Sequence, residues 1–280
     1  MERLRKAMER AWADRQRVIQ PQPEPPSVRT PPATVPRETD GSGVQIRYTH
    51  KARVVIDPGA LRDEGILVLE GQRVAVGLHA GAGDAYKVLG TQILHQMRAK
   101  SHRTLAITSP GRGDGKTTIA INLAIRLARD LNQPLLLVDF DLRHPSIGRS
   151  FTGRDLPGLI EYLAGEVELA EVLLAPGLER LLILPGGKRT RHSSEVLLSP
   201  RVLKRVEELK GRYEDRLILF DMPPLFAGDD VIACLPHVDA VMLVVEDGKV
   251  SRKQLDHADE LFGEKCLGIV LNKAKTRIAP

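Results

Sequence analysis

The residues with the clearest chemical meaning lie in one stretch, 107–124, which reads ITSPGRGDGKTTIAINLA. A strand-like apolar run (104–108) leads into a glycine-rich loop (109–115), and an amphipathic segment begins at Lys116. Glycines let consecutive backbone N–H groups converge on an anion, and the start of a helix adds partial positive charge. The stretch therefore predicts a P-loop, in which Lys116 reaches the β- and γ-phosphates and the Thr117 hydroxyl binds Mg²⁺. Pro110 stands where the usual spacing has glycine, so a capped turn before an ordinary helix is the alternative.

Aspartates at the ends of two later apolar runs strengthen the P-loop interpretation. PLLLVDFDLRHP places Asp139 and Asp141 at the end of one run, and RLILFDMPP places Asp221 at the end of another. A single aspartate after a strand more often caps a helix or forms a turn. Three of them downstream of a P-loop form a constellation that can bind Mg²⁺ and orient a hydroxyl group or a water molecule. The sequence thus predicts a site for a nucleoside triphosphate with magnesium.

Apolar runs alternate with periodic helical segments along most of the chain, which predicts an α/β fold: a mainly parallel sheet with helices on both faces. One helix is expected at 200–211, with Ser199 as its cap, Pro200 as its first residue and Gly211 at its end. In such sheets ligands bind beyond the carboxyl ends of the strands. The expected strands are 103–108, 134–140, 180–185, 216–221, 240–246 and 267–272.

Composition divides the chain into zones. Residues 1–19 are expected to form an amphipathic, charged helix, which either binds a partner or frays in solvent. The proline-rich stretch 20–45 is expected to be a disordered linker, since it cannot pack a core. The P-loop domain is expected over 46–280, with an N-terminal docking segment and a helix (84–99) in 46–100 and the nucleotide-binding core in 101–280.

Charge, hydropathy and cysteine content narrow the functional classes. The net charge is +5 over 280 residues and aromatic residues make up 4%, which argues for neither nucleic acid nor a stacking platform. No apolar run approaches the length of a membrane span, and the N-terminus is too charged for a secretory signal. Cys234 and Cys266 are expected to be buried thiols of a reducing compartment. We therefore expect a cytoplasmic protein.

The motifs together resemble those of the bacterial tyrosine kinases (BY-kinases) of capsule and exopolysaccharide assembly, over roughly residues 46–275. SPGRGDGKTTIAINLA, LLLVDFDLRHPSIGRSF and LILFDMPPLFAGDDVIAC are similar to their Walker A, Walker A′ and Walker B motifs. The segments DAYKVLGTQIL, LLILPGGKRTRHSSEVLLSP and VDAVMLVVEDGKVSRKQL extend the resemblance. The most similar subgroup is the soluble exosortase-associated autokinases, and MinD/ParA-type ATPases are more distant kin.

The resemblance implies roles for particular residues. Lys116 would stabilise charge on the transferred phosphoryl group, while Thr117, Asp141 and Asp221 would hold Mg²⁺. Asp139 is the expected residue to orient or deprotonate a tyrosine hydroxyl. Arg143 either braces the Walker A′ loop or touches phosphate; both remain open. The residues expected to contact ATP are Gly111, Arg112, Gly113, Asp114, Gly115, Lys116, Thr117, Thr118 and, near the adenine, Asn272.

The implied function is an ATP- and Mg²⁺-dependent tyrosine autokinase that regulates exopolysaccharide or capsule biosynthesis. Its expected partner and activator is a membrane polysaccharide co-polymerase, which would hold it at the inner face of the cell membrane. The alternative is a MinD/ParA-like ATPase switch that regulates the same export machinery without phosphorylating protein. A partitioning ATPase acting on nucleic acid is disfavoured, because Gly111 stands where those proteins carry an extra lysine.

Two features depart from the family pattern. Many relatives end in a tyrosine cluster, whereas no tyrosine follows Tyr213 here. Tyr86 and Tyr162 are expected to be packed, which leaves Tyr48 as the first candidate acceptor. Relatives also carry a Glu-x-x-Arg-x-x-Arg pattern that docks neighbouring subunits. This chain carries Asp84, Lys87 and Gly90 at those positions, so that assembly into a homo-oligomer stays open. The basic loop 189–194 is either solvated or accepts an acidic partner.

Overall fold

The computed structural model describes residues 52–53, 68–70, 73–75, 82–212 and 216–274. The expectations for the helix at 1–19, the linker at 20–45, Tyr48 and Tyr213 lie outside the described residues and stay predictions.

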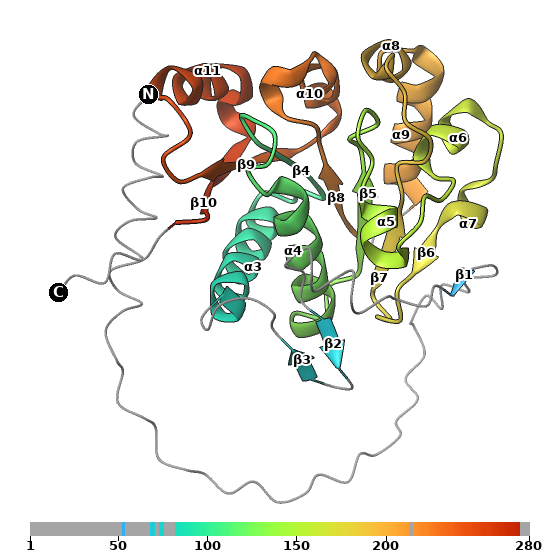
Figure 1. The fold of residues 1–280 in the computed structure, drawn as a ribbon, viewed down its shortest axis with the longest axis horizontal. Coiled ribbons are helices and arrows are strands. Elements are labelled where there is room, and N and C mark those ends of the chain that lie inside the picture. The colour runs from blue at the N-terminus through green and yellow to red at the C-terminus, as the bar shows by residue number, and fades with distance from the viewer. Residues whose placement is uncertain (1–51, 54–67, 71–72, 76–81, 213–215, 275–280) are drawn as a thin grey trace, which may run out of the picture.

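The main sheet has eight strands in the order β1-β6-β7-β5-β8-β4-β9-β10 (Figure 1). All neighbours from β7 to β10 pair in parallel, whereas the short strand β6, between β1 and β7, runs antiparallel to β7. The expected mainly parallel sheet is confirmed, and every expected strand is present. The strands are β1 (Ala52–Arg53), β4 (Thr104–Thr108), β5 (Leu135–Asp139), β6 (Leu174–Ala175), β7 (Leu181–Leu184), β8 (Leu217–Asp221), β9 (Ala240–Glu246) and β10 (Cys266–Asn272). A separate antiparallel pair consists of β2 (Val68–Glu70) and β3 (Arg73–Ala75).

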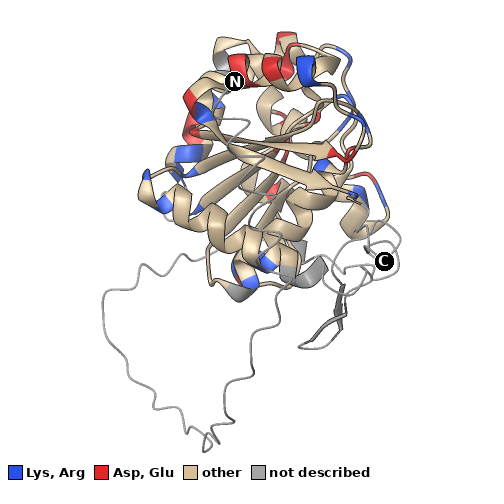
Figure 2. Ribbon diagram, turned by 90° about the vertical axis from the view of Figure 1, so that its left-hand side faces the viewer, with Lys and Arg blue, Asp and Glu red and all other residues tan. Residues whose placement is uncertain are grey.

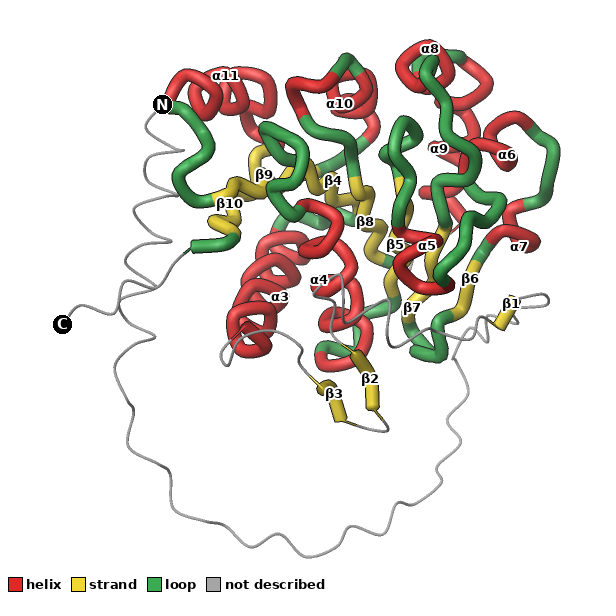
Figure 3. The backbone as a smooth tube through the Cα atoms, in the orientation of Figure 1, coloured by secondary structure: helices red, strands yellow, loops and turns green. Residues whose placement is uncertain are grey.

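Helices cover both faces of the sheet, as expected (Figure 3). Alternate residues of the strands from β4 to β10 belong to different apolar clusters, which divide the helices between the two faces. One face carries α3 (Ala82–Ala99), α4 (Lys116–Asp130) and α5 (Ile147–Thr152). The other carries α6 (Leu159–Ala164), α7 (Leu169–Val172), α8 (Ser193–Leu197), α9 (Pro200–Arg212), α10 (Asp230–Cys234) and α11 (Arg252–Phe262). Short 3-10 turns are η1 (Leu225–Ala227), η2 (Leu235–His237) and η3 (Gly263–Lys265).

Burial on both faces explains why the central strands read as continuous apolar runs. Every residue of β4, β5 and β8 is buried, and each leucine side chain fully removed from water contributes about 1.5–3 kcal/mol. Figure 2 shows Lys, Arg, Asp and Glu mainly on the outer helices and loops, while the strands are almost wholly tan. The polar exceptions lie at strand ends, where the functional site is expected.

The structure corrects the expected end of one helix and the expected burial of one cysteine, and it confirms the expected packing of two tyrosines. The helix α9 continues to Arg212, one residue past the expected end at Gly211, because Gly211 does not adopt the left-handed conformation that would end it. Tyr86 and Tyr162 are packed as expected: Tyr86 accepts a hydrogen bond from Asn122 (3.2 Å), and Tyr162 is 5% exposed. Cys234 is buried, whereas Cys266 is only partly so, which corrects the expectation for that thiol.

Gly90 lies on the face of α3 that packs against α4. It is buried, and a Cβ atom there would lie 3.6 Å from Leu127 Cδ2. Lys87, one turn earlier, is exposed. None of the helices in the described ranges combines the length and the apolar character needed to cross a bilayer.

Asp239, in the segment before β9, is hydrogen-bonded to the beginning of β4. Its Oδ2 accepts hydrogen bonds from the backbone N–H groups of Arg103 (2.8 Å) and Thr104 (2.9 Å). The Thr104 hydroxyl accepts one from the Asp239 N–H in return (2.8 Å). Burial alone would raise the pKa of Asp239, but these hydrogen bonds outweigh it and lower the pKa. The ionised carboxylate therefore stabilises the folded state.

We expect Asp239→Ala to lower the free energy of unfolding by about 1.5–3 kcal/mol at pH 7, the usual value for hydrogen bonds to a charged group. A carboxylate with a lowered folded-state pKa stabilises above its unfolded pKa, about 4, and loses that effect as the pH falls through the folded value. The difference between variant and wild type should therefore shrink below about pH 4. Urea unfolding at a series of pH values measures it.

The matched control for this prediction is Glu179→Ala, which removes an exposed acid from the turn before β7 and should change stability by less than about 0.5 kcal/mol. A loss at Asp239 that stayed constant from pH 7 to pH 3.5 would contradict a role for the ionised carboxylate.

Candidate active site

The loop between β4 and α4 is folded into an anion cradle by its own side chains. The Asp114 carboxylate accepts a hydrogen bond from the Gly111 N–H (2.9 Å), and the Ser109 hydroxyl donates to the Gly111 carbonyl (2.7 Å). Gly113 and Gly115 have φ angles of 80° and 95°, in the left-handed region that glycine adopts without strain. Gly115 is also the N-cap of α4, so the loop delivers the N-terminus of a 15-residue helix to the anion position.

The end of β10 holds this loop from outside. The Asn272 side-chain amide donates to the Asp114 carbonyl (2.8 Å), and Lys273 Nζ donates to the Gly113 carbonyl (2.7 Å). A Cβ atom on Gly115 would lie 2.1 Å from Asn272 Nδ2, so glycine is required there on steric grounds as well. Asn272 therefore contacts the P-loop backbone; its expected contact with adenine stays a prediction. Sequence reasoning did not predict this role of Lys273, because in the sequence it is only a basic residue after a strand.

Strand register brings the catalytic candidates together. In the parallel pairing of β5 with β8, Asp139 lies opposite Asp221. Lys116 Nζ lies 3.0 Å from Asp141 Oδ2 and 3.7 Å from Asp221 Oδ1. The Thr117 hydroxyl donates to Asp221 Oδ2 (2.6 Å). One lysine, one hydroxyl and three carboxylates thus converge at the carboxyl edge of the sheet, where the loops gather (Figure 3).

Burial controls the electrostatics of this cluster. The Lys116 side chain is 12% exposed and that of Asp221 is 0% exposed. Burial alone would lower the pKa of Lys116, but the charges of Asp221 and Asp141 outweigh it and raise the pKa. Burial, together with the charge of Asp221, raises the pKa of Asp139 to about 7, and burial also raises that of Asp221. The site therefore has more acidic groups than its single lysine neutralises, which suits a further cation.

Oxygen atoms are available for such a cation. Among the described residues, Asp139 Oδ1 and Asp221 Oδ1 are buried without a hydrogen-bond partner. Hydroxyl and carboxylate oxygens are the ligands that Mg²⁺ prefers, so Thr117, Asp141 and Asp221 fit this ion chemically. No group of three or more His, Cys, Asp or Glu side chains in the described part of the chain is arranged to hold a metal unaided.

Asp139 also holds the loop that carries Asp141. Its Oδ2 accepts hydrogen bonds from the N–H groups of Ser146 (2.8 Å) and Ile147 (2.9 Å), which begin α5. The carboxylate is covered by Gly186, where a Cβ atom would lie 3.3 Å from Asp139 Cγ. Asp139 is therefore a structural anchor of the loop through one oxygen, while its other oxygen is free of such bonds.

Arg143 is engaged by side chains from two other elements, as expected for the bracing alternative. Its Nε lies 3.0 Å from Asp230 Oδ2 and 2.8 Å from the Ser193 hydroxyl, and Nη2 donates to Ser194 (3.1 Å). Gly228 leaves room for the guanidinium, since a Cβ atom there would lie 2.8 Å from Nη2. Sequence reasoning did not predict the contacts of Arg143 with Asp230, Ser193 and Ser194, because these contacts depend on tertiary packing.

The remaining expected residues lie at the same edge. The Arg112 guanidinium contacts His144 Nε2 (2.6 Å) and so joins the P-loop to the loop after β5. Thr118 is half-buried in the first turn of α4. Every residue expected to contact the nucleotide thus belongs to the P-loop, the first turn of α4 or the end of β10.

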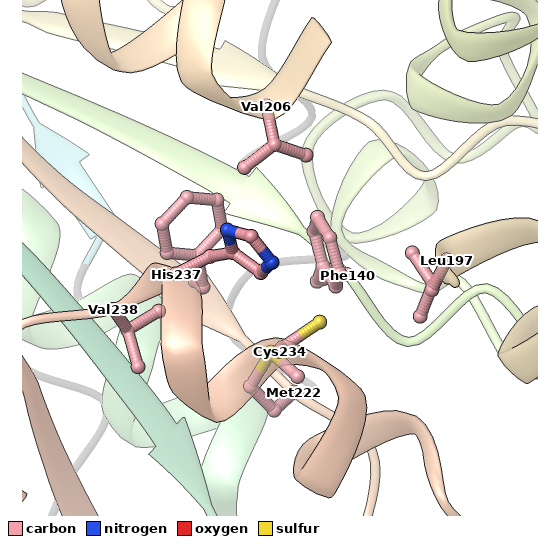
Figure 4. Close-up of a pocket in the computed structure, with 8 residues that line it drawn as sticks. Phe140, Leu197, Val206, Met222, Cys234, His237 and Val238 are labelled. Atoms are coloured by element: carbon pink, nitrogen blue, oxygen red, sulfur yellow. The ribbon is translucent and has the colours of Figure 1, made fainter. Parts of the chain in front are cut away.

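A separate apolar cavity lies behind the site, among β5, β8 and the helices α8, α9 and α10 (Figure 4). Burial raises the pKa of the Cys234 thiol at this cavity, so the sulfur there is protonated at neutral pH. Its walls offer no cradle for phosphate. The lining residues are Phe140, Leu197, Val206, Phe220, Met222, Cys234, His237 and Val238.

The P-loop, the paired acidic strand ends and the parallel sheet define an α/β nucleotide-binding protein of the P-loop type. The chain is 31% identical over 189 residues to tyrosine-protein kinase CpsD of Streptococcus agalactiae, an alignment that covers 66% of this chain and 81% of that protein. The chain belongs to this family of bacterial tyrosine kinases, and it is a protein-tyrosine kinase.

Two further similarities agree with this assignment. The kinase domain of VpsO superposes with a TM-score of 0.59 at 28% identity, covering 69% of this chain and 97% of that domain. The succinoglycan biosynthesis transport protein ExoP of Rhizobium meliloti is 33% identical over 185 residues, which cover 64% of this chain and 23% of ExoP. The chain matches no protein-family model.

The contacts from the end of β10 predict a loss of nucleotide affinity when they are removed. Asn272→Ala deletes a hydrogen bond worth about 1 kcal/mol to the P-loop conformation, which corresponds to roughly fivefold weaker binding. Lys273→Ala should weaken nucleotide binding about twofold, because the Lys273 side chain is half-exposed. Calorimetric titration with a non-hydrolysable ATP analogue and Mg²⁺ measures both. Lys253→Ala, an exposed site on α11, is the control, and unchanged affinity for Asn272→Ala would refute the clamp.

The ion pair between Arg143 and Asp230 predicts strong coupling, since Asp230 is 2% exposed. Arg143→Ala leaves this carboxylate buried and unpaired, and should cost about 2–4 kcal/mol of unfolding free energy. Asp230→Asn in the same chain removes the stranded charge, so the double variant should recover part of that loss. Urea unfolding of the four proteins gives the coupling energy; strictly additive losses would show that the pair does not act as a unit.

Proposed function

We propose that this kinase transfers the γ-phosphoryl group of ATP, with Mg²⁺, to tyrosine hydroxyls in exopolysaccharide or capsule biosynthesis. The observation that carries the proposal is the meeting of Lys116 with Asp141 and Asp221 directly beside Thr117. A buried cation next to oxygen ligands, at the start of a helix, is the arrangement that phosphoryl transfer requires.

Each residue then has a distinct role. The P-loop N–H groups from Gly111 onward bind the phosphates, and Lys116 leaves its carboxylate partners to stabilise charge on the transferred group. Thr117, Asp141 and Asp221 hold Mg²⁺, in part through water. When bound, the metal neutralises charge on the phosphate oxygens.

Asp139 is proposed to orient the incoming tyrosine hydroxyl and to accept its proton through Oδ1. A pKa raised to about 7 places this carboxylate where a general base works best near neutral pH. The unperturbed pKa of tyrosine is about 10, so that positioning contributes alongside proton acceptance. Tyr48 is the first candidate acceptor within this chain.

A membrane polysaccharide co-polymerase is the proposed partner, and the chain is proposed to work in the cytoplasm at the inner face of the membrane through it. The similarity to ExoP supports this proposal, because the matched region is only 23% of that transport protein. A region similar to this chain therefore occurs within a polysaccharide transport protein, and we infer that this kinase acts together with a membrane protein of that kind.

Mass spectrometry of the purified protein after incubation with ATP and Mg²⁺ tests the proposal. We expect a tyrosine phosphopeptide in the wild type and none in Lys116→Met. Asp139→Asn should lower transfer by about 100-fold or more, while nucleotide affinity changes much less. Equal loss of both would make Asp139 chiefly structural.

Release of ADP without phosphotyrosine would contradict the proposed reaction and would favour the nucleotide-dependent switch.

A further inference from the structure

The loop 185–192, between β7 and α8, runs directly beside the loop that carries the catalytic acids. The Thr190 N–H donates to the Leu142 carbonyl (2.9 Å). A Cβ atom on Gly186 would lie 2.6 Å from Pro145 Cβ. The hydroxyl of Ser193, two residues after Arg191, accepts a hydrogen bond from Arg143. The two loops therefore form one continuous surface at the carboxyl edge of the sheet.

Exposed basic residues stand on both sides of the catalytic acids. Lys188, Arg189 and Arg191 are exposed on the loop after β7, and Arg112 is exposed on the P-loop side, where it meets His144. Within 186–195 the one acid is Glu195, which pairs with His192 at 3.3 Å. Among the residues that the structure describes, no carboxylate pairs with Lys188, Arg189 or Arg191. We call these four basic residues, Arg112, Lys188, Arg189 and Arg191, the basic rim.

The rim is built on a buried support. Glu161 is 5% exposed, and its carboxylate accepts hydrogen bonds from the N–H groups of Lys188 (3.1 Å) and Gly158 (2.7 Å). Gly187 has a φ angle of 87°, and a Cβ atom there would lie 2.1 Å from Glu161 Oε2. These contacts hold the backbone of the loop at Gly187 and Lys188, so the exposed basic side chains project from a supported backbone.

Distance separates most of the rim from the nucleotide. In the strand order β7-β5-β8-β4, β7 lies three strand spacings from the P-loop strand, which is about 14 Å. Lys188, Arg189 and Arg191 are therefore placed beyond the phosphates, on the far side of Asp139. An extended peptide advances about 3.3 Å per residue, so residues about two to four positions from a tyrosine would reach them.

We propose that the basic rim recognises acidic residues next to the acceptor tyrosine, so that the preferred substrate is an acidic tyrosine-containing segment of a partner protein. This inference deepens the proposed kinase function and rests on it. Tyr48 has Arg47 directly before it and Lys51 three residues after it, so the rim makes it a weaker acceptor than an acidic segment of another protein, although it stays the first candidate within this chain. Complementary charges on two binding partners contribute mainly to the specificity of binding and to the association rate.

The test uses two fluorescent peptides of equal length, in which one tyrosine is flanked either by Glu and Asp or by Gln and Asn. Binding to the full chain is measured by anisotropy with Mg²⁺ and a non-hydrolysable ATP analogue. We expect the acidic peptide to bind about tenfold more tightly at low salt, with the difference shrinking as salt rises. Equal affinity for both peptides would overturn the inference.

The variant with Arg189→Ala and Arg191→Ala should lose about fivefold of its affinity for the acidic peptide and little for the neutral one. Nucleotide affinity should not change, because these side chains lie away from the phosphates. The control carries Arg252→Ala and Lys253→Ala, which remove the same charge from exposed positions of α11. Preference for the acidic peptide that survived in the Arg189 and Arg191 variant would overturn the assignment, as would equal binding of a single-stranded oligonucleotide of the same charge. Since binding is measured without phosphoryl transfer, either result is independent of whether phosphotyrosine forms.

Discussion

The ion pairs between Lys116 and the acids around it are the interaction on which the rest of the site depends. A buried lysine and buried carboxylates each lose hydration on folding, and only mutual attraction at short range offsets that cost. Here a single ammonium group, 3.0 Å from Asp141, faces acids whose number exceeds its charge. Such a cluster stabilises the fold poorly. It is instead prepared for a metal ion and phosphate groups, whose arrival would redistribute the charge.

The sheet tolerates this cluster because its apolar strands fix the atoms that carry the charge. The register that sets Asp139 opposite Asp221 follows from residues such as Leu136 and Ile218, which are buried on the same face. Slipping that register by one residue would turn every side chain to the other face. The carboxylates therefore stay together although they repel one another, because the apolar packing of the strands offsets the free energy of that repulsion.

The sequence predicts those features that repeat locally or that sheet geometry aligns. Continuous apolar runs revealed the strands, and parallel pairing guarantees that Asp139, Asp141 and Asp221 end at one edge. The contacts of Arg143 with Ser193, and of Lys273 with the P-loop, depend on the spatial order of strands. That order cannot be read from any local pattern. The short strand β6, antiparallel to β7, escaped prediction for another reason: two residues are too few to show a period.

The supports of the two loops lie on opposite sides of the site, and this separation has a functional consequence. The P-loop is held from β10 by Asn272 and Lys273, whereas the loop after β5 is held from α8 and α10 through Arg143. Asp139 connects the two sides, because it lies opposite Asp221 in the sheet and its carboxylate also accepts the hydrogen bonds that anchor α5. Substitutions near β7 and α8 can therefore change which acceptor is bound while leaving the phosphate cradle intact. A kinase family that keeps its nucleotide chemistry and changes its partners would be expected to vary on that side of the sheet.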